Sequence, residues 1–173
     1  MALTIEELKL AGLATLSEGE IIKDGEIITV EVPYNDYKDY YNWVSPNWVL
    51  KEAAIADIQT KLYTEVKELR ETTMYNGINF IRDGVDTGCL IKGDTQAISD
   101  LGLIYNSFVN GSTSETWTYS NRKEETFTSL EDSAVLYKFA AKFRSKCIST
   151  RAKVERIIEL IDSMEDIVEF NLE

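Results

Sequence analysis

The residues that could do chemistry in this chain are carboxylates and thiols, because the sequence contains no histidine. It has 173 residues, with 30 Asp plus Glu against 18 Lys plus Arg, and a formal net charge of −12. Without an imidazole, Ser-His-Asp and Cys-His catalysis and imidazole metal sites are excluded. A glycosidase-like pair of carboxylates stays open as an alternative, but no Asp or Glu falls in a recognisable catalytic motif.

Two thiols and three aspartates are the remaining candidates for redox or metal chemistry. Cys89 and Cys147 lie far apart in the sequence, so we expect two reduced, mostly buried thiols rather than a CxxC pair or a disulfide framework. Asp83, Asp86 and Asp94 lack the spacing of an EF-hand calcium loop, and we interpret them as turn formers. We therefore expect no catalytic residue, no metal ligand and no cofactor.

The acidic charge also limits the partners. Binding to nucleic acid needs clustered Lys and Arg, which carboxylates outnumber along most of this chain, so we expect no nucleic-acid partner. An acidic surface suits a basic protein partner, or solubility alone. Glu6 and Glu7 stand where a signal peptide would be basic, and no apolar run approaches the roughly 18 residues that span a bilayer. We expect a protein that is made in a cytoplasm and has no membrane contact.

Aromatic residues interleaved with Asn and Asp form the most prominent candidate binding segment. The six residues are Tyr34, Tyr37, Tyr40, Tyr41, Trp43 and Trp48. Rings with polar tips are typical of interface cores, so we interpret this segment as a protein interface, with Trp48 linking it to the next helix. A glycan-binding patch is the alternative, because aromatic rings beside amides and carboxylates can stack on sugars.

The elements before and around this segment follow from capping and turn signals. Thr4 and Glu7 have capping-box spacing for a short helix to about Gly12. Residues 20–32 place an Asp-Gly turn between two β-rich runs, which predicts a hairpin. Ser45-Pro46 then predicts a helix start, with Ser as N-cap and Pro at the first helical position. We accordingly expect a docking segment over residues 1–45 and a helical domain over 46–173.

The helical domain is predicted to contain two long helices and a medium one. The first long helix follows an apolar stripe through Ile55, Leu62 and Leu69 to about Thr72, and with Trp48 this spacing permits a short coiled coil. The medium helix starts at Asp94 or Thr95 and stops at Asn110-Gly111. The second long helix starts at Ser129 and continues to near the C-terminus.

Small hairpins complete the prediction of an α+β fold that is mostly helical. Asn76-Gly77 indicates a hairpin turn within residues 75–80, with further turns at 82–84 and 86–88. A third hairpin is expected over residues 116–128. The last helix should overshoot a compact domain and pack on something outside it. Its basic middle is either a solvated face or a partner for carboxylates of a neighbouring chain or helix. That basic middle comprises Arg144, Lys146, Arg151, Lys153 and Arg156.

From about Ile55 to Asp162, the order of these motifs resembles a domain family of unknown function from tailed bacteriophages, found at the C-terminal ends of tail-fibre and other tail-associated proteins. The matching motifs are Tyr75-Asn76-Gly77-Ile78, Thr95-Gln96-Ala97-Ile98, the Trp117 hairpin and the Ala-containing last helix. The stretch 81–92 is longer than the family's usual connection. The resemblance implies a virion or virion-assembly component, with structural roles for Asn76, Gly77, Gln96 and Trp117.

These observations lead to one functional hypothesis and two alternatives. We expect a structural protein of a phage tail, a fibre or baseplate adaptor that contacts other tail proteins, forms a homo-oligomer within the particle and is located in the virion. A tail-fibre assembly chaperone is the first alternative, and a receptor-binding or glycan-binding tail component is the second. Each of the three acts without catalysis.

Overall fold

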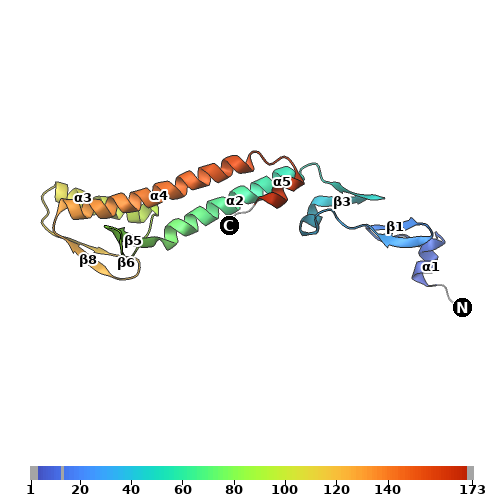
Figure 1. Cartoon of the computed structure of the whole chain (residues 1–173), viewed down its shortest axis with the longest axis horizontal. Helices are drawn as coiled ribbons and strands as arrows, with labels where there is room; N and C mark the ends of the chain where they lie inside the picture. Colours follow the sequence, from blue (N-terminus) through green and yellow to red (C-terminus); the bar gives the residue numbers. More distant parts are fainter. Residues whose placement is uncertain (1–3, 13, 171–173) are drawn as a thin grey trace. The chain divides into compact units, whose positions relative to one another are not determined.

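The fold is α+β, as predicted, and it divides into two compact units. The computed structural model describes residues 4–12 and 14–170. The units are Met1–Ile58 and Gln59–Glu173. Within the described residues, two long helices and one medium helix accompany four two-stranded antiparallel hairpins (Figure 1). None of the described helices combines the length and apolar character that a membrane crossing requires.

The first unit consists of short elements. They are α1 (Ile5–Leu10), β1 (Glu20–Lys23), β2 (Glu26–Thr29), the 3-10 helix η1 (Asn35–Tyr40), β3 (Tyr41–Val44) and β4 (Asn47–Leu50). The predicted capping box is confirmed, because the Thr4 side chain accepts from the Glu7 N–H and the Glu7 carboxylate accepts from the Thr4 N–H. The first hairpin is confirmed too: Asp24 and Gly25 both have positive φ, which the turn requires.

The helix predicted to begin at Ser45-Pro46 is wrong. These two residues form the turn between β3 and β4. Trp43 of β3 pairs with Trp48 of β4 in this hairpin. The flanking residues alternate between larger and smaller burial with a period of two, which is the pattern of a strand, and Pro is as suitable for a turn as for a helix start. Helix α2 begins later, at Ala54, so Trp48 belongs to a strand and not to a helical heptad. The division between the two units falls after Ile58.

The second unit contains most of α2 and all later elements. They are α2 (Ala54–Asn76), β5 (Ile78–Arg82), β6 (Val85–Ile91), α3 (Thr95–Val109), β7 (Glu115–Thr118), β8 (Glu124–Phe127), α4 (Leu130–Ile158) and α5 (Met164–Glu169). The predicted start signals of α3 and α4 are confirmed, because Asp94 and Ser129 accept backbone N–H groups as N-caps. Helices α3 and α4 pack together, and the third hairpin forms as predicted.

The predicted hairpin turn at Asn76-Gly77 is also wrong. Asn76 is the last residue of α2, and Gly77 follows it with a φ of 77°. A glycine with positive φ ends a helix as readily as it turns a hairpin. The turn of this hairpin is Asp83-Gly84, where both residues have positive φ, and residues 86–88 lie within β6.

The last helix is shorter than predicted. Helix α4 ends at Ile158, and a separate helix, α5, begins after a capping box in which Ser163 and Asp166 satisfy each other's N–H groups. Ile161 is buried, and Gln59 of α2 donates its Nε2 to the carbonyls of Ile158, at 3.1 Å, and Ile161, at 2.8 Å. The end of α4 is therefore capped by its own chain. Because Gln59 lies near the start of α2 and Ile158 is the last residue of α4, the two helices lie side by side and antiparallel.

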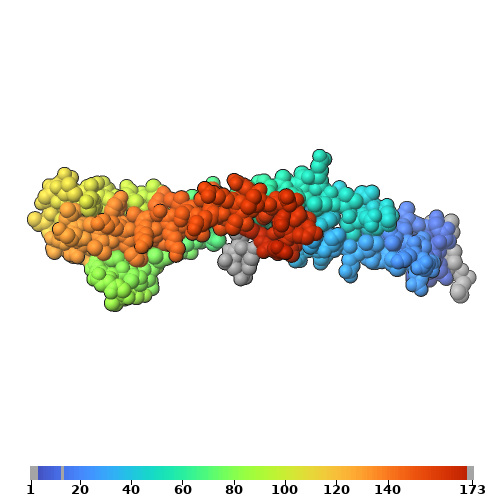
Figure 2. Space-filling view, turned by 45° about the horizontal axis from the view of Figure 1, so that its top comes forward, coloured from blue at the N-terminus to red at the C-terminus, as the bar shows by residue number. Residues whose placement is uncertain are grey.

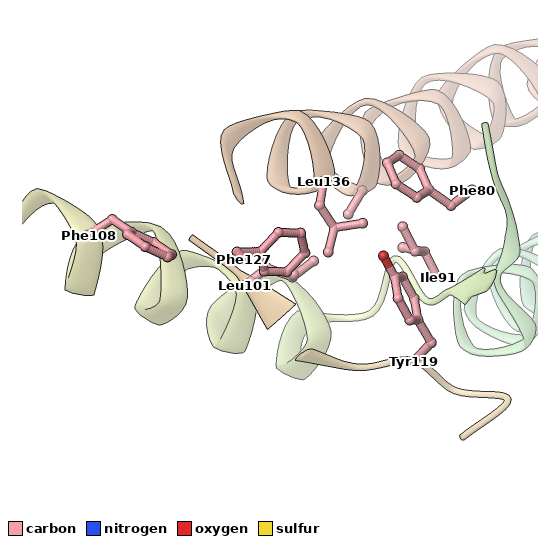
Figure 3. Close-up of a cluster of buried hydrophobic side chains, with 8 residues drawn as sticks. Phe80, Ile91, Leu101, Phe108, Tyr119, Phe127 and Leu136 are labelled. Carbon is pink, nitrogen blue, oxygen red and sulfur yellow. The ribbon is translucent and has the colours of Figure 1, made fainter. Parts of the chain in front are cut away.

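The core of the second unit lies where α3 and α4 meet the two hairpins (Figure 3). Its buried members are Phe80, Ile91, Leu101, Phe108, Tyr119, Phe127, Leu136 and Ala140. The Phe80 ring stacks on Tyr119 at 6.5 Å and meets Phe139 edge-on at 5.0 Å between centroids. Burial raises the pKa of Tyr119, and its hydroxyl donates to the Glu125 carboxylate, which also holds the Arg82 guanidinium at 2.7 Å. This contact ties the two hairpins together.

Candidate functional site

The aromatic segment predicted as an interface lies around η1 and the second hairpin of the first unit. Its six residues are Tyr34, Tyr37, Tyr40, Tyr41, Trp43 and Trp48. All six side chains are buried or half-buried. Much of their ring surface is therefore covered by the chain itself, and the remainder is what a partner or a glycan could reach.

Contacts within the segment explain this burial. The rings of Trp43 and Trp48 meet edge-on across the hairpin at 5.3 Å, and the Trp48 indole N–H donates to the Val30 carbonyl at 2.8 Å. The Lys38 ammonium lies 5.7 Å from the centre of the Trp48 ring, which is within the range of a cation–π contact. The tryptophans thus join β3 and β4 to the chain that follows β2. A role in binding a partner stays a prediction for this segment.

The four motif residues of the phage-family resemblance occupy structural positions. Asn76 and Gly77 end α2, and a Cβ at Gly77 would lie only 2.3 Å from the Ile91 carbonyl oxygen. Gln96, on the first turn of α3, donates to the Asp100 carboxylate at 2.6 Å. Trp117 packs against the core, where its indole nitrogen is buried without an acceptor among the described residues.

The aspartates considered as calcium ligands serve the local fold. Asp83 has a φ of 51° in the turn of the β5–β6 hairpin. Asp86 accepts from the Gly88 N–H at 2.7 Å and from the Asn79 amide at 2.9 Å, and Asp94 caps α3. Within residues 4–12 and 14–170, no group of three or more His, Cys, Asp or Glu side chains is placed to hold a metal ion.

A second candidate site is a groove of about 700 Å³ between α2 and α4. Apolar side chains form most of its lining: Val66, Leu69, Ile78, Phe139, Phe143, Val154, Ile157 and Phe170. Leu69 and Ile157 are each 52% exposed, so the groove is open to solvent. Leu69 lies on the apolar stripe from which this helix was predicted, and the structure places it at the open surface.

Cations, and no carboxylates, accompany this apolar lining. The four are Arg70, Lys142, Lys146 and Arg151. Arg70 contacts Glu71 at 2.9 Å and Arg151 contacts Glu155 at 2.6 Å, while the Arg70 Nε is buried without an acceptor among the described residues. Neither lysine forms an ion pair with a described carboxylate. The groove is therefore locally basic in a chain of net charge −12.

A free thiol lies in the same groove. Cys147 and Cys89 are both free thiols and are half-buried, less covered than the mostly buried thiols that were predicted, and Cys147 is part of the groove lining. Burial raises the pKa of Cys147 above its ordinary value, which keeps the thiol protonated and slow to react near neutral pH. Cys147 is therefore better placed as a reporter of access to the groove than as a nucleophile.

Sequence reasoning found the parts of this groove but not the groove. The apolar stripe of the first long helix and the basic run of the last one were recognised, but not that the two helices leave an open groove between them. Thr73, Lys146 and Thr150 stand among the apolar residues of the groove lining. Polar residues within an apolar stripe were the available signal.

Comparison with known proteins does not assign the chain to a family. No family model, no curated protein and no solved structure matches it.

Proposed function

We propose that this chain is a structural protein of a bacteriophage tail, a fibre or baseplate component that works through contacts with other proteins. The observation that carries the protein-contact part is the open apolar groove between α2 and α4. The tail assignment rests on the motif order of residues 55–162, which resembles the tail-associated domain family.

An open apolar surface with charged margins supports a role in protein contact. Folded proteins seldom leave large contiguous apolar surfaces in water unless another molecule covers them. In the second unit, Leu69 and Ile157 expose about half of their surface in the groove itself, and Leu160, just beyond α4, is 78% exposed. Apolar centres with polar margins are the usual anatomy of protein interfaces.

The division into two units supports an adaptor role. Each unit has its own hairpins, and each presents a different surface: half-buried rings in the first and a basic apolar groove in the second. An adaptor needs two surfaces that can hold two different neighbours. The first unit would hold one tail protein and the groove another.

Mass spectrometry of purified particles tests the proposal. We expect the chain to be recovered in virions, and amine-reactive cross-linking to join Lys142 or Lys146 to a second virion protein. Lys138, on the same helix but outside the groove lining, is the matched control and should cross-link less. Presence in infected cells together with absence from particles would favour the assembly-chaperone alternative. Absence of any cross-link from the groove lysines would contradict the proposed contact.

A further inference from the structure

We infer that the groove between α2 and α4 holds an acidic amphipathic α-helix supplied by a different protein. This inference rests on the proposed function and names the chemistry of the partner.

The length of the groove fits a helix of several turns. Its lining on α4 extends from Phe139 to Ile157. At the rise of an α-helix, this interval corresponds to about 27 Å, or about five turns. Leu69, on α2, is exposed opposite that stretch, so one apolar stripe of an incoming helix would find apolar side chains on both walls. Recognition of this kind uses anchors at positions i, i+3, i+4 and i+7.

The charge of the groove selects an acidic helix. Its charged lining residues are all cationic, and Lys142 and Lys146 stand one helical turn apart without a described carboxylate partner. The buried Arg70 Nε also has no acceptor among the described residues. Carboxylates beside the apolar stripe of the incoming helix would neutralise these cations, whereas lysines there would be repelled.

A second copy of this chain fits the groove poorly. A twofold contact through the groove places the same patch on both sides, so Lys142 and Lys146 of both copies would face one another. The short acidic helices of a second copy, α1 and α5, contain six residues each. Each is about 9 Å long, which covers a third of the groove. The occupant is therefore assigned to another protein.

A pair of designed peptides tests the inference on the full-length chain. The first is a helical peptide of five turns with a Leu stripe flanked by Glu, and the second has every Glu replaced by Lys. Fluorescence anisotropy should show binding of the Glu peptide that weakens as salt rises from about 50 to about 500 mM. The Lys peptide should bind at least about tenfold more weakly.

Charge reversal on α4 supplies the matched variants. The double variant Lys142→Glu with Lys146→Glu should bind the Glu peptide at least about tenfold more weakly and the Lys peptide more tightly. Lys138→Glu with Lys153→Glu changes the charge of the same helix by the same amount, outside the groove lining, and should leave both affinities nearly unchanged. All four lysines are exposed, so the variants should fold, which far-UV circular dichroism checks.

Alkylation of Cys147 locates the bound peptide. At a pH near 9, the Glu peptide should slow alkylation of Cys147 and leave Cys89 unaffected, because only Cys147 lines the groove. Equal binding of both peptides, no binding of the Glu peptide, or binding without protection of Cys147 would overturn the inference. Recovery in virions is a separate result: a chain present in particles but unable to bind the peptide loses only the groove assignment. A chain that binds the peptide but is absent from particles loses only the tail assignment.

Discussion

The two units of this chain are stabilised in different ways. In the second unit, eight buried side chains from two helices and two hairpins meet in one cluster. In residues 4–50, as far as the structure describes them, Tyr41 is the only large apolar side chain that is buried. The first unit depends instead on turn geometry, ring contacts such as Trp43 on Trp48, and single hydrogen bonds.

The two units should therefore differ in stability. Burial of apolar surface is the main favourable term in folding, so the second unit should carry most of the free energy of unfolding. Hairpins of two short strands are only marginally stable by themselves. For the proposed function, this difference suits the first unit to gain order on docking and the second to present a preformed surface.

The largest effect should come from truncating the core. Phe80→Ala should lower the free energy of unfolding of the second unit by about 3–5 kcal/mol, because Phe80 is fully buried and contacts two other rings. Trp43→Ala removes a half-buried ring from the first unit and should cost about 1–2 kcal/mol there. Urea unfolding followed by hydrogen exchange on separate peptides measures both. Equal losses would erase the contrast between the units.

A backbone substitution should have the next largest effect. Gly77→Ala introduces a methyl group 2.3 Å from the Ile91 carbonyl oxygen at a φ of 77°. Gly84→Ala is the matched control, with a φ of 80° and no atom within 4 Å. The control should lower the free energy of unfolding by the strain of the left-handed backbone alone, about 1–2 kcal/mol, which thermal unfolding measures. Gly77→Ala should cost clearly more. Equal losses would mean that the close approach between α2 and β6 adds no rigidity to the second unit.

Removal of helix caps should have a smaller effect on stability, and that effect should differ between the two units. Ser129→Ala deletes the N-cap of α4, which is packed on the core, and should lower the free energy of unfolding of the second unit by about 1 kcal/mol. Thr4→Ala deletes the cap of α1, which has no buried residue, and should change only the local exchange of its amides. A global loss from Thr4→Ala would show that α1 belongs to a cooperative core.

The smallest expected effect is a loss of stability of the first unit at acidic pH. A hydrogen bond from Lys9, followed by one from the Ser17 N–H, lowers the pKa of Glu20 below its ordinary value. The folded first unit therefore binds this proton less readily than the unfolded chain, so the contribution of Glu20 is present above the unfolded pKa and is lost as the pH falls through the lowered folded value. The protection factors of amides near β1, which correct for the slower intrinsic exchange in acid, should fall on acidification below about pH 4.5. The Glu20→Gln variant should lack this step near β1.

Local signals in the sequence predicted most of the fold. The capping boxes and caps at Thr4, Asp94 and Ser129 and the Asp-Gly turn at residue 24 were found because each depends on neighbours in sequence. Ser45-Pro46 and Asn76-Gly77 were misassigned because Pro and Gly serve both turns and helix ends. Packing outside the local window decides between these uses.

The candidate site was less predictable than the fold. Ring-rich composition drew attention to residues 34–48, yet the rings largely contact one another. The groove depends on how α2 and α4 lie beside each other, and no periodicity reveals contacts between them such as that of Gln59 with Ile158. A stripe in the sequence indicates which residues are apolar, but not whether another helix covers them.

The Gln59 contact has a consequence for biosynthesis. Gln59 leaves the ribosome 99 residues before Ile158 and 102 residues before Ile161, the two carbonyls that it caps. Nearly the whole second unit must emerge before this amide finds its acceptors, and contacts between such distant residues form slowly because a long loop has to close first. A chain released by the ribosome before Ile158 would keep Gln59 and lose both of its acceptors. The contact thus forms only after the whole of α4 has been synthesised.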